Sequence, residues 1–397
     1  MAMKILYILN STDTNGGATK SFLTLLNGIS AKGVEPYLVT PNKAGLYQEL
    51  SDKGYKLLCL NYRPSTYPNL KTLKDLFLFL PRLFGRRILE HLAVRRIVNF
   101  CKTNRIDLIH TNVSIITCGL SAARKLHIPH VLHFREYGDL DFNFKYYPTQ
   151  QSLYRNLDFP QSYTICITKD IQQHHRLSPP NSHVIYNGID IKPAIEKQLS
   201  QSQPFFLFAG RIEPSKDPMQ VVKAYHGFLQ KHPDTIFTLK IAGGISDHAY
   251  MRKLQSYIKN NALNGHINYL GARQDINQLM HDACAVIVSS KHEAFGRCLP
   301  ETMLNHGLTI GRYTGGTKEQ LDNGLVFCNR PIGLHYNTTK ELTELMEMVT
   351  ETPADFFNEM KSDAFNMVKS LYSKENCINN TYSFYCDIIN NSNYEYS

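Results

Sequence analysis

A strand-to-helix passage near residue 290 limits the fold of this chain more than any other stretch. Cys284–Ser290 (CAVIVSS) is short, apolar and β-branched, which is typical of a buried strand in a parallel sheet. Phe295-Gly296 provides a turn, and Pro300 stands where a first helical turn tolerates its missing N–H. The passage therefore predicts an α/β fold.

Two glutamates of this passage are expected to face one ligand. Glu293 stands at the carboxyl end of the predicted strand, and Glu301 projects from the start of the next helix. Open α/β sheets bind ligands at this edge. Carboxylates accept hydrogen bonds from sugar hydroxyls, and N–H groups at helix starts bind phosphates, so the pair suits a ligand that combines both. The alternative is that the glutamates merely cap a helix.

The rest of the chain repeats this alternation of apolar runs and amphipathic helices, and 397 residues are too many for one core. The sequence therefore predicts two α/β domains. Strands expected in the first domain are Lys4–Leu9, Pro36–Thr40, Leu57–Leu60, Ile106–His110, His130–Phe134, Thr164–Ile167 and His183–Tyr186. Those expected in the second are Phe205–Ala209, Ile236–Ala242, His266–Leu270, Cys284–Ser290 and Leu325–Cys328. Lys192–Gln203 is the predicted linker, and residues from Thr339 onward are expected to be helical.

Loops after the first strand of each half carry further candidate ligand groups. Gly210-Arg211 and Lys216 follow Phe205–Ala209, and fixed cations there suit a diphosphate. Gly16-Gly17 follows the first strand and opens a helix, where backbone N–H groups can approach a ligand. Surface cations and a tight turn are the respective alternatives.

These pieces resemble the family 4 glycosyltransferases. HEAFGRCLPE followed by TGGTKEQ resembles their E-x7-E signature and glycine pair, and Asn187-Gly188-Ile189-Asp190 resembles the element that closes their first domain. The resemblance implies the GT-B fold, in which two Rossmann-like domains face a cleft. Residues 1–190 would be the acceptor-side domain and 191–371 the donor domain, with a C-terminal helix, 372–397, crossing back to the first domain.

The resemblance also assigns roles on the donor side. Arg211 and Lys216 are expected to contact the donor diphosphate. Glu293 is expected near the donor sugar, and Glu301 is expected to accept hydrogen bonds from the ribose hydroxyls. The other residues expected to bind or frame the donor are Gly16, Gly17, Gly210, Arg273, Phe295, Gly296, Gly315, Gly316 and Thr317.

His133 is the candidate from the first domain, because it stands at the carboxyl end of a predicted strand with Arg135 and Glu136 beside it. A histidine there can donate to a sugar hydroxyl or shift protons near neutral pH. His110, also at the end of a strand, competes for this role, and a buried core histidine is the alternative for both.

The implied activity is that of a retaining glycosyltransferase needing no metal or other cofactor. It would move a sugar from a UDP- or GDP-sugar to a hydroxyl of a saccharide or lipid-linked saccharide in surface-polysaccharide synthesis. A D-x-D pair, Asp139 and Asp141, could hold a metal but lies far along the chain from the Arg211 loop, so no metal is expected. A nucleotide-sugar epimerase or hydrolase, and a non-catalytic sugar-binding protein, are the alternatives.

Residues 71–105 carry nine basic and two acidic side chains, and the whole chain has a net charge of +9. Leu76–Leu80 and other apolar residues interleave with the arginines, which predicts amphipathic helices lying on an anionic membrane. A solvated helix face is the alternative. No nucleic-acid partner is expected, because no recognition motif accompanies the charge.

The expected location is the cytoplasm, peripheral to the inner face of the cytoplasmic membrane. Nine scattered cysteines favour a reducing compartment. No run approaches the roughly 20 apolar residues of a membrane-spanning helix. The start MAMKILYILNS is interpreted as a first strand and not as a signal peptide.

Overall fold

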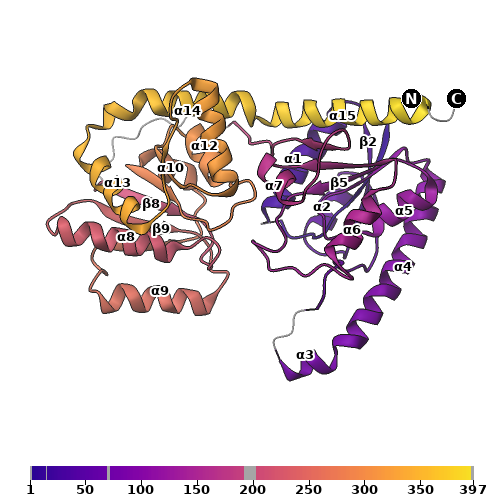
Figure 1. Cartoon of the computed structure of the whole chain (residues 1–397), viewed down its shortest axis with the longest axis horizontal. Coiled ribbons are helices and arrows are strands. Elements are labelled where there is room, and N and C mark those ends of the chain that lie inside the picture. Colours follow the sequence, from indigo (N-terminus) through magenta and orange to yellow (C-terminus); the bar gives the residue numbers. More distant parts are fainter. Residues whose placement is uncertain (1, 15, 69–71, 192–202, 395–397) are drawn as a thin grey trace. The chain divides into compact units, whose positions relative to one another are not determined.

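The computed structural model describes residues 2–14, 16–68, 72–191 and 203–394, which form two compact units. The first unit combines Met1–Gly188 with Lys374–Ser397, and the second is Ile189–Ser373 (Figure 1). The predicted linker Lys192–Gln203 lies, except for its last residue, outside the described residues.

The first unit contains a seven-stranded parallel sheet with the order β3-β2-β1-β4-β5-β6-β7. Its strands are β1 (Lys4–Ile8), β2 (Glu35–Thr40), β3 (Lys56–Cys59), β4 (Leu108–Thr111), β5 (His130–Phe134), β6 (Ser162–Cys166) and β7 (Ser182–Val184). The seven strands predicted for this half are therefore confirmed. Every residue of β4 and β5 is buried, as expected for central strands covered by helices on both faces.

Helices of the first unit connect these strands, and one returns from the far end of the chain. They are α1 (Gly17–Ala31), α2 (Leu46–Asp52), α3 (Leu73–Phe77), α4 (Phe79–Asn104), α5 (Cys118–Leu126), α6 (Gln150–Leu157), α7 (Lys169–His174) and α15 (Lys374–Tyr394). Helix α1 buries Phe22, Leu25, Leu26 and Ile29, spaced as one helical face.

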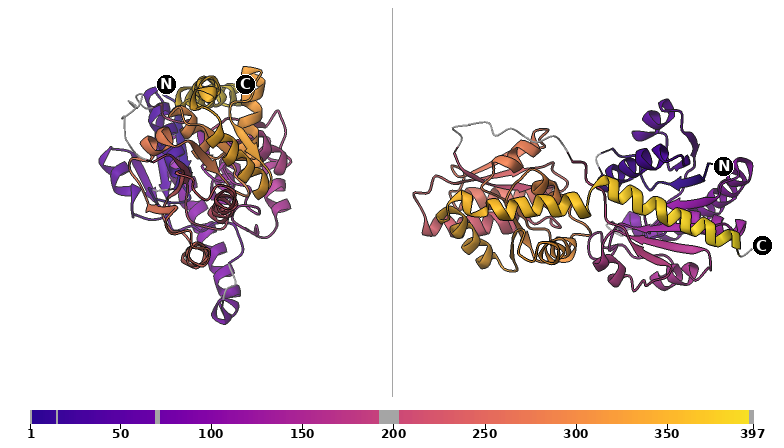
Figure 2. Two further views of the ribbon diagram at one scale, coloured as in Figure 1. Left: turned by 90° about the vertical axis from the view of Figure 1, so that its left-hand side faces the viewer. Right: turned by 90° about the horizontal axis from the view of Figure 1, so that it is seen from above.

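The C-terminal helix α15 is part of the first core. Phe384, Tyr385 and Ile388 are buried in the same apolar cluster as the buried face of α1. Figure 2 shows α15, in yellow, running along the first unit. Gly28 allows this contact, because a Cβ there would lie 2.1 Å from Ile378 Cδ1.

The second unit contains a six-stranded parallel sheet with the order β10-β9-β8-β11-β12-β13. Its strands are β8 (Phe205–Ala209), β9 (Thr238–Ala242), β10 (Ile267–Gly271), β11 (Ala285–Val288), β12 (Thr309–Arg312) and β13 (Leu334–Tyr336). Its helices are α8 (Pro218–Lys231), α9 (His248–Asn260), α10 (Ile276–Asp282), α11 (Cys298–Leu304), α12 (Gly315–Cys328), α13 (Thr339–Glu351), a 3-10 turn (Ala354–Phe357) and α14 (Asn358–Leu371). The helical character predicted from Thr339 onward is confirmed.

One predicted strand is wrong. Leu325–Cys328 forms the last turn of α12, and its apolar side chains point largely to solvent, with Val326 85% exposed. The helix is anchored instead by buried Leu321 and by Gly324, where a Cβ would lie 2.2 Å from Ile332. The true strands of this region, β12 and β13, were not predicted because their sequences, TIGR and LHY, mix apolar with polar or charged residues and form no continuous apolar run.

In both sheets the strand order reverses at a switch point, between β1 and β4 in the first and between β8 and β11 in the second. The carboxyl ends of the strands at such a point form the ligand-binding edge of an open α/β sheet. Chemistry is therefore expected in the loops that follow these four strands.

Candidate functional site

The loops after β8 and β11 bring together two residues that lie 77 positions apart in the chain. Lys216 follows β8, Glu293 follows β11, and the Lys216 ammonium lies 2.6 Å from Glu293 Oε2 and 2.9 Å from Oε1. Both side chains are largely buried, at 23% and 16% exposed. The structure therefore places an ion pair at the switch point of the second sheet.

Backbone hydrogen bonds tie together the loops that follow five neighbouring strands of this sheet. Each bond joins one loop to the next in the order β10, β9, β8, β11 and β12. The bonds run from Gly243 N–H to Gly271 O (2.8 Å), from Ile212 N–H to Gly244 O (2.9 Å), from Lys291 N–H to Ser215 O (2.9 Å) and from Gly316 N–H to Glu293 O (2.6 Å). The site is thus held by a continuous backbone frame.

Two glycines are needed for this frame to close. Gly243 has φ of 155°, and a Cβ there would lie 1.8 Å from Gly210 O. A Cβ on Gly316 would lie 2.6 Å from Phe295 O, so any larger residue would push the start of α12 away from Glu293. The predicted site glycines 210 and 316 therefore belong to one set of close backbone contacts.

The other predicted residues of this passage surround the start of α12. Thr317 is buried, and Gly296 and Gly315 both have positive φ. The ring of Phe295 packs edge-on against Tyr372, 5.6 Å between centroids, so this side chain is part of the core. What Phe295 contributes to the edge of the site is its backbone.

Arg211 and Glu301 each have a local partner. Arg211 is 56% exposed and pairs with Glu213 at 3.1 Å. Glu301 lies in the first turn of α11 and accepts from Arg297 at 3.0 Å. Both groups are at the site edge, and a ligand would have to compete with these partners.

Sequence reasoning overlooked Asp217 and Arg297. Asp217 has φ of 50°, and its carboxylate lies 3.6 Å from Arg312 and 3.8 Å from Lys291. Nothing in the sequence indicates this cluster, because its members follow three different strands. The Arg297 pair with Glu301 has i, i+4 spacing, which is a readable signal.

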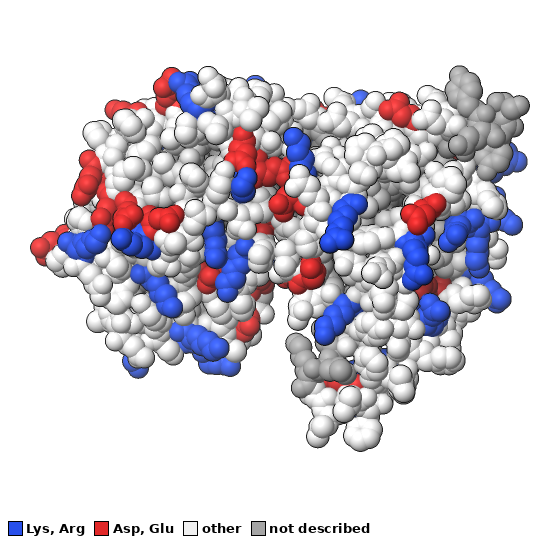
Figure 3. Space-filling model, viewed as in Figure 1, with Lys and Arg blue, Asp and Glu red and all other residues white. Residues whose placement is uncertain are grey.

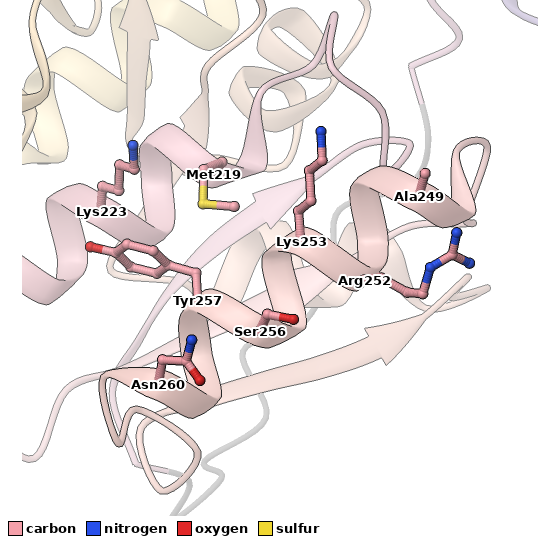
Figure 4. A pocket seen from close by; sticks show the side chains of 8 residues that line it. All are labelled: Met219, Lys223, Ala249, Arg252, Lys253, Ser256, Tyr257 and Asn260. Carbon is pink, nitrogen blue, oxygen red and sulfur yellow. The ribbon is translucent and has the colours of Figure 1, made fainter.

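Arg273 lies in the loop after β10, as predicted, and forms a local ion pair with Asp275 at 2.6 Å. Both side chains are more than 40% exposed. Figure 4 shows a different feature of this unit, an open groove between α8 and α9 with Lys223, Arg252 and Tyr257 among its lining residues. None of the predicted site residues is among the described residues that line it.

The glycine loop of the first unit leads into α1. Gly17 is the first residue of the helix, and Gly16 caps it without any side-chain hydrogen bond. A Cβ at Gly16 would meet only Thr19 Oγ1, at 3.5 Å, so sterics do not demand glycine there. The preceding residue, 15, lies outside the described residues.

His133 is buried at the end of β5 and contacts the competing candidate His110. His133 Nδ1 lies 3.2 Å from His110 Nε2, and the two strands are neighbours. Burial, and then the nearby Arg135 charge, hold the pKa of both imidazoles well below its usual value. Both histidines are therefore neutral at physiological pH.

Arg135 and Glu136 continue the polar edge of the first sheet. The Arg135 guanidinium donates to Asn112 Oδ1 (3.0 Å) and Asn187 Oδ1 (2.7 Å), joining the segments after β4, β5 and β7. Glu136 Oε1 accepts from Ser114 N–H (3.0 Å) and Ser114 Oγ–H (2.7 Å). Burial nevertheless raises the pKa of Glu136 to about 7.

No cluster of three or more His, Cys, Asp or Glu side chains in the described ranges is arranged to hold a metal ion. Asp141, of the D-x-D pair, accepts from the backbone N–H groups of Tyr137 and Gly138. Asp139 accepts from His174 at 2.8 Å. Asp141 thus stabilises its own loop, and Asp139 joins that loop to α7.

Glu136 makes the stability of the first unit depend on pH. Its folded-state pKa of about 7 exceeds its ordinary value of 4.5. The folded state therefore keeps a proton that the unfolded state releases, and stability falls as the pH rises from about 4.5 to 7, by up to about 3 kcal/mol. We expect Glu136→Gln to flatten this slope in urea unfolding between pH 5 and 8.

Glu351→Gln, at an exposed carboxyl of the second unit, is the control and should leave the slope unchanged. A Glu136→Gln protein with the wild-type pH dependence would contradict the assignment of this titration to Glu136.

Comparison with known proteins identifies the family. Residues 15–192 match Glycosyltransferase Family 4, and residues 190–361 match Glycosyl transferases group 1. D-inositol 3-phosphate glycosyltransferase of Corynebacterium kroppenstedtii is 21% identical over 167 residues, which are 38% of this chain and 37% of that protein. The match thus spans just over a third of that relative.

Two solved structures share the fold over nearly the whole chain. A glycosyltransferase from Rickettsia africae is 18% identical with a TM-score of 0.77, covering 98% of this chain and 99% of its own. HepE from Anabaena, solved with UDP and glucose, is 19% identical with a TM-score of 0.71, covering 97% and 99%. The resemblance inferred from the E-x7-E passage is confirmed: the chain belongs to the family 4 glycosyltransferases, and its two Rossmann-like units have the GT-B fold.

Proposed function

We propose that this chain is a retaining glycosyltransferase that moves a sugar from a UDP- or GDP-sugar to a hydroxyl of a saccharide or lipid-linked saccharide. The observation that carries the proposal is the Lys216–Glu293 pair, held on a backbone frame at the switch point of the second sheet. The Lys216 ammonium can stabilise the negative charge of a diphosphate, and the Glu293 carboxylate can accept a hydrogen bond from a sugar hydroxyl. One donor molecule would use both members of the pair.

In the proposed reaction the bond between the anomeric carbon and the diphosphate oxygen breaks as the acceptor oxygen bonds to the same face of the sugar. The acceptor proton passes to the leaving diphosphate, whose charge Lys216 and Arg211 stabilise. Glu293 and Glu301 hold donor hydroxyls. A glycosidase-like mechanism with a carboxylate nucleophile is disfavoured, because both oxygens of Glu293 lie within 3 Å of the Lys216 ammonium.

Nucleotide binding without a metal ion is the first test. A ligand at 100 times its Kd that binds only the folded state stabilises it by about 2.7 kcal/mol. We expect UDP or GDP, with EDTA present, to raise the thermal midpoint of the second unit by several degrees. UDP comes first because HepE was solved with it. A rise that appears only with Mg²⁺ would refute the metal-free site, and no rise with any nucleotide would refute the donor proposal.

The two cations are predicted to act on the leaving group. Removing one preorganised group that stabilises transition-state charge costs about 10²–10³ in kcat. We expect Lys216→Ala and Arg211→Ala to lose turnover on that order while donor affinity changes much less. Lys223→Ala, an exposed cation on α8, is the matched control.

Wild-type turnover in both variants would contradict this role. Release of free sugar or an epimerised donor, with no transfer to any acceptor, would favour the epimerase or hydrolase alternative.

A hollow in the first unit supports a saccharide acceptor. Its lining combines charged, hydroxyl and aromatic groups from α4, α5, α6 and the segment before α6, among them Arg87, Glu90, Thr117 and Tyr147. Glu90 accepts from Thr117 Oγ1 at 2.6 Å, and the Arg87 guanidinium lies 5.7 Å from the centre of the Tyr147 ring. Such mixed surfaces suit sugars, whose rings carry apolar faces and hydroxyl edges.

The same helix α4 continues into a projecting arm, here residues 72–92, which supports contact with an anionic membrane (Figure 1). Exposed apolar residues follow one another at helical spacing along the arm. They are Leu73, Leu76, Phe77, Leu80, Phe84, Ile88 and Leu92. The end of the arm is mainly uncharged on the face seen in Figure 3.

Basic residues flank this apolar stripe, and Arg82 is paired with Asp75 while Arg87 covers Tyr147. Apolar side chains that insert and cations that meet lipid headgroups are the two requirements of an interfacial helix. No helix among the described residues is long and apolar enough to span a bilayer. We therefore propose a protein on the inner face of the cytoplasmic membrane, working on a lipid-linked acceptor for a surface polysaccharide.

Membrane contact through the arm can be measured by co-sedimentation with vesicles of phosphatidylglycerol and phosphatidylcholine. Burying a Leu or Phe side chain contributes about 1.5–3 kcal/mol. We expect the double variant Leu80→Ser/Phe84→Ser to bind these vesicles at least tenfold more weakly. Ile236→Ser, at an exposed apolar residue of the second unit, is the control.

The membrane proposal would be refuted if the wild-type protein did not co-sediment with these vesicles. The proposal would also be refuted if the wild-type protein were an oligomer in solution and the Leu80→Ser/Phe84→Ser variant were a monomer. The apolar stripe would then be a contact between copies of the chain.

A further inference from the structure

Three buried side chains from distant parts of the chain form a line of hydrogen bonds in the first unit. The Tyr385 hydroxyl, on α15, lies 2.5 Å from His110 Nδ1 on β4. His110 Nε2 lies 3.2 Å from His133 Nδ1 on β5. All three side chains are at most 3% exposed. The C-terminal helix therefore contacts the candidate histidine of the first sheet through one intermediate residue.

The number of hydrogens on this line restricts their arrangement. Burial raises the pKa of Tyr385 and lowers the pKa of both histidines, so all three groups are neutral. A neutral imidazole carries one N–H and one acceptor nitrogen. Both hydrogen bonds must therefore point the same way along the line, and the direction decides which nitrogen of His133 carries its hydrogen.

Chemistry favours donation from Tyr385. A phenol is more acidic than a neutral imidazole N–H, and an imidazole nitrogen is more basic than a phenol oxygen. If Tyr385 donates to His110 Nδ1, His110 donates from Nε2 to His133 Nδ1, and the hydrogen of His133 is on Nε2. In the opposite direction the Tyr385 hydrogen would need another acceptor, for which Tyr7, in the same buried cluster, is the candidate.

The free end of the line is an unsatisfied group. His133 Nε2 is buried and has no hydrogen-bond partner among the described residues. An unpaired buried donor costs about 1–3 kcal/mol, which a ligand oxygen or an ordered water would recover. His133 lies at the carboxyl end of β5, the edge where such sheets bind ligands.

We propose that Tyr385 is a positioning residue, which fixes the tautomer of His133 so that the unpartnered Nε2 carries the hydrogen and can donate it to a substrate oxygen. The substrate part rests on the proposed function. In this tautomer His133 has no free lone pair toward the ligand, so it donates to a sugar hydroxyl and does not act as a general base. Of the two roles that the sequence left open for His133, donation from Tyr385 along this line selects the donor.

The tautomer can be observed directly in the full-length protein. Imidazole ¹⁵N and ¹³C spectra, with His133 assigned by His133→Gln, should show the hydrogen on Nε2. Tyr385→Phe keeps the ring and removes the hydroxyl, so the Nδ1–H form of His133 should appear. Tyr382→Phe on the same helix and Tyr7→Phe in the same cluster should leave the spectrum unchanged.

A wild-type His133 with its hydrogen on Nδ1 would overturn the proposal. An unchanged spectrum in Tyr385→Phe would do so as well, and a change in Tyr7→Phe would show that the line runs the other way. These readouts need no substrate, so they are independent of the proposed function.

Activity tests the functional half. Loss of one aligned neutral hydrogen bond corresponds to a fall of roughly tenfold in kcat. We expect this fall in Tyr385→Phe, with unchanged UDP or GDP binding by the second unit and a first unit that still unfolds cooperatively. A shifted tautomer with wild-type kcat would refute the positioning role. Nucleotides that fail to bind the wild-type protein would refute the proposed function and leave the tautomer result standing.

Discussion

The second unit depends on a series of backbone hydrogen bonds that joins the loops after five adjacent strands. Because the strands are parallel, these loops all lie at one edge of the sheet. Strand pairing alone does not fix the conformation of each loop. The bonds from Gly243 to Gly271 and from Gly316 to Glu293 lie toward its two ends. Because backbone groups make the frame, the Lys216 and Glu293 side chains are left to interact with each other and with a ligand.

The charges at the site are also paired within the protein. Lys216, Arg211 and Glu301 each have a protein partner. Lys216 and Glu293 are largely buried, so leaving either charge unpaired would be costly. Arg211 is 56% exposed, and its pair with Glu213 is a weaker, solvent-screened contact. In the proposed reaction a donor would replace these pairs with contacts to its own diphosphate and hydroxyls, so that binding exchanges one set of charge contacts for another.

The first unit differs from the second because its core includes a helix from the far end of the chain, α15, which begins at Lys374. Helix α15 packs on α1 over Gly28 and places the Tyr385 hydroxyl against His110 of β4. The long return of the chain thus has a chemical consequence besides stability. A hydroxyl from the end of the chain contacts His110, which in turn contacts His133, and we infer that it sets the hydrogen positions of both histidines.

The sequence alone determined the α/β class, the two domains and the E-x7-E passage, because apolar runs and turn residues are local signals. It also located eleven of the thirteen strands among the described residues, all except β12 and β13. It misassigned Leu325–Cys328, since an apolar run has the same letters whether it is buried in a strand or exposed on a helix. Only tertiary structure could show that Lys216 pairs with Glu293, that Asp217 gathers two cations, and that Tyr385 reaches His110. The separations along the chain are 77 residues for Lys216 and Glu293, 95 for Asp217 and Arg312, and 275 for Tyr385 and His110. Side chains that meet across such separations leave no periodic pattern in the sequence.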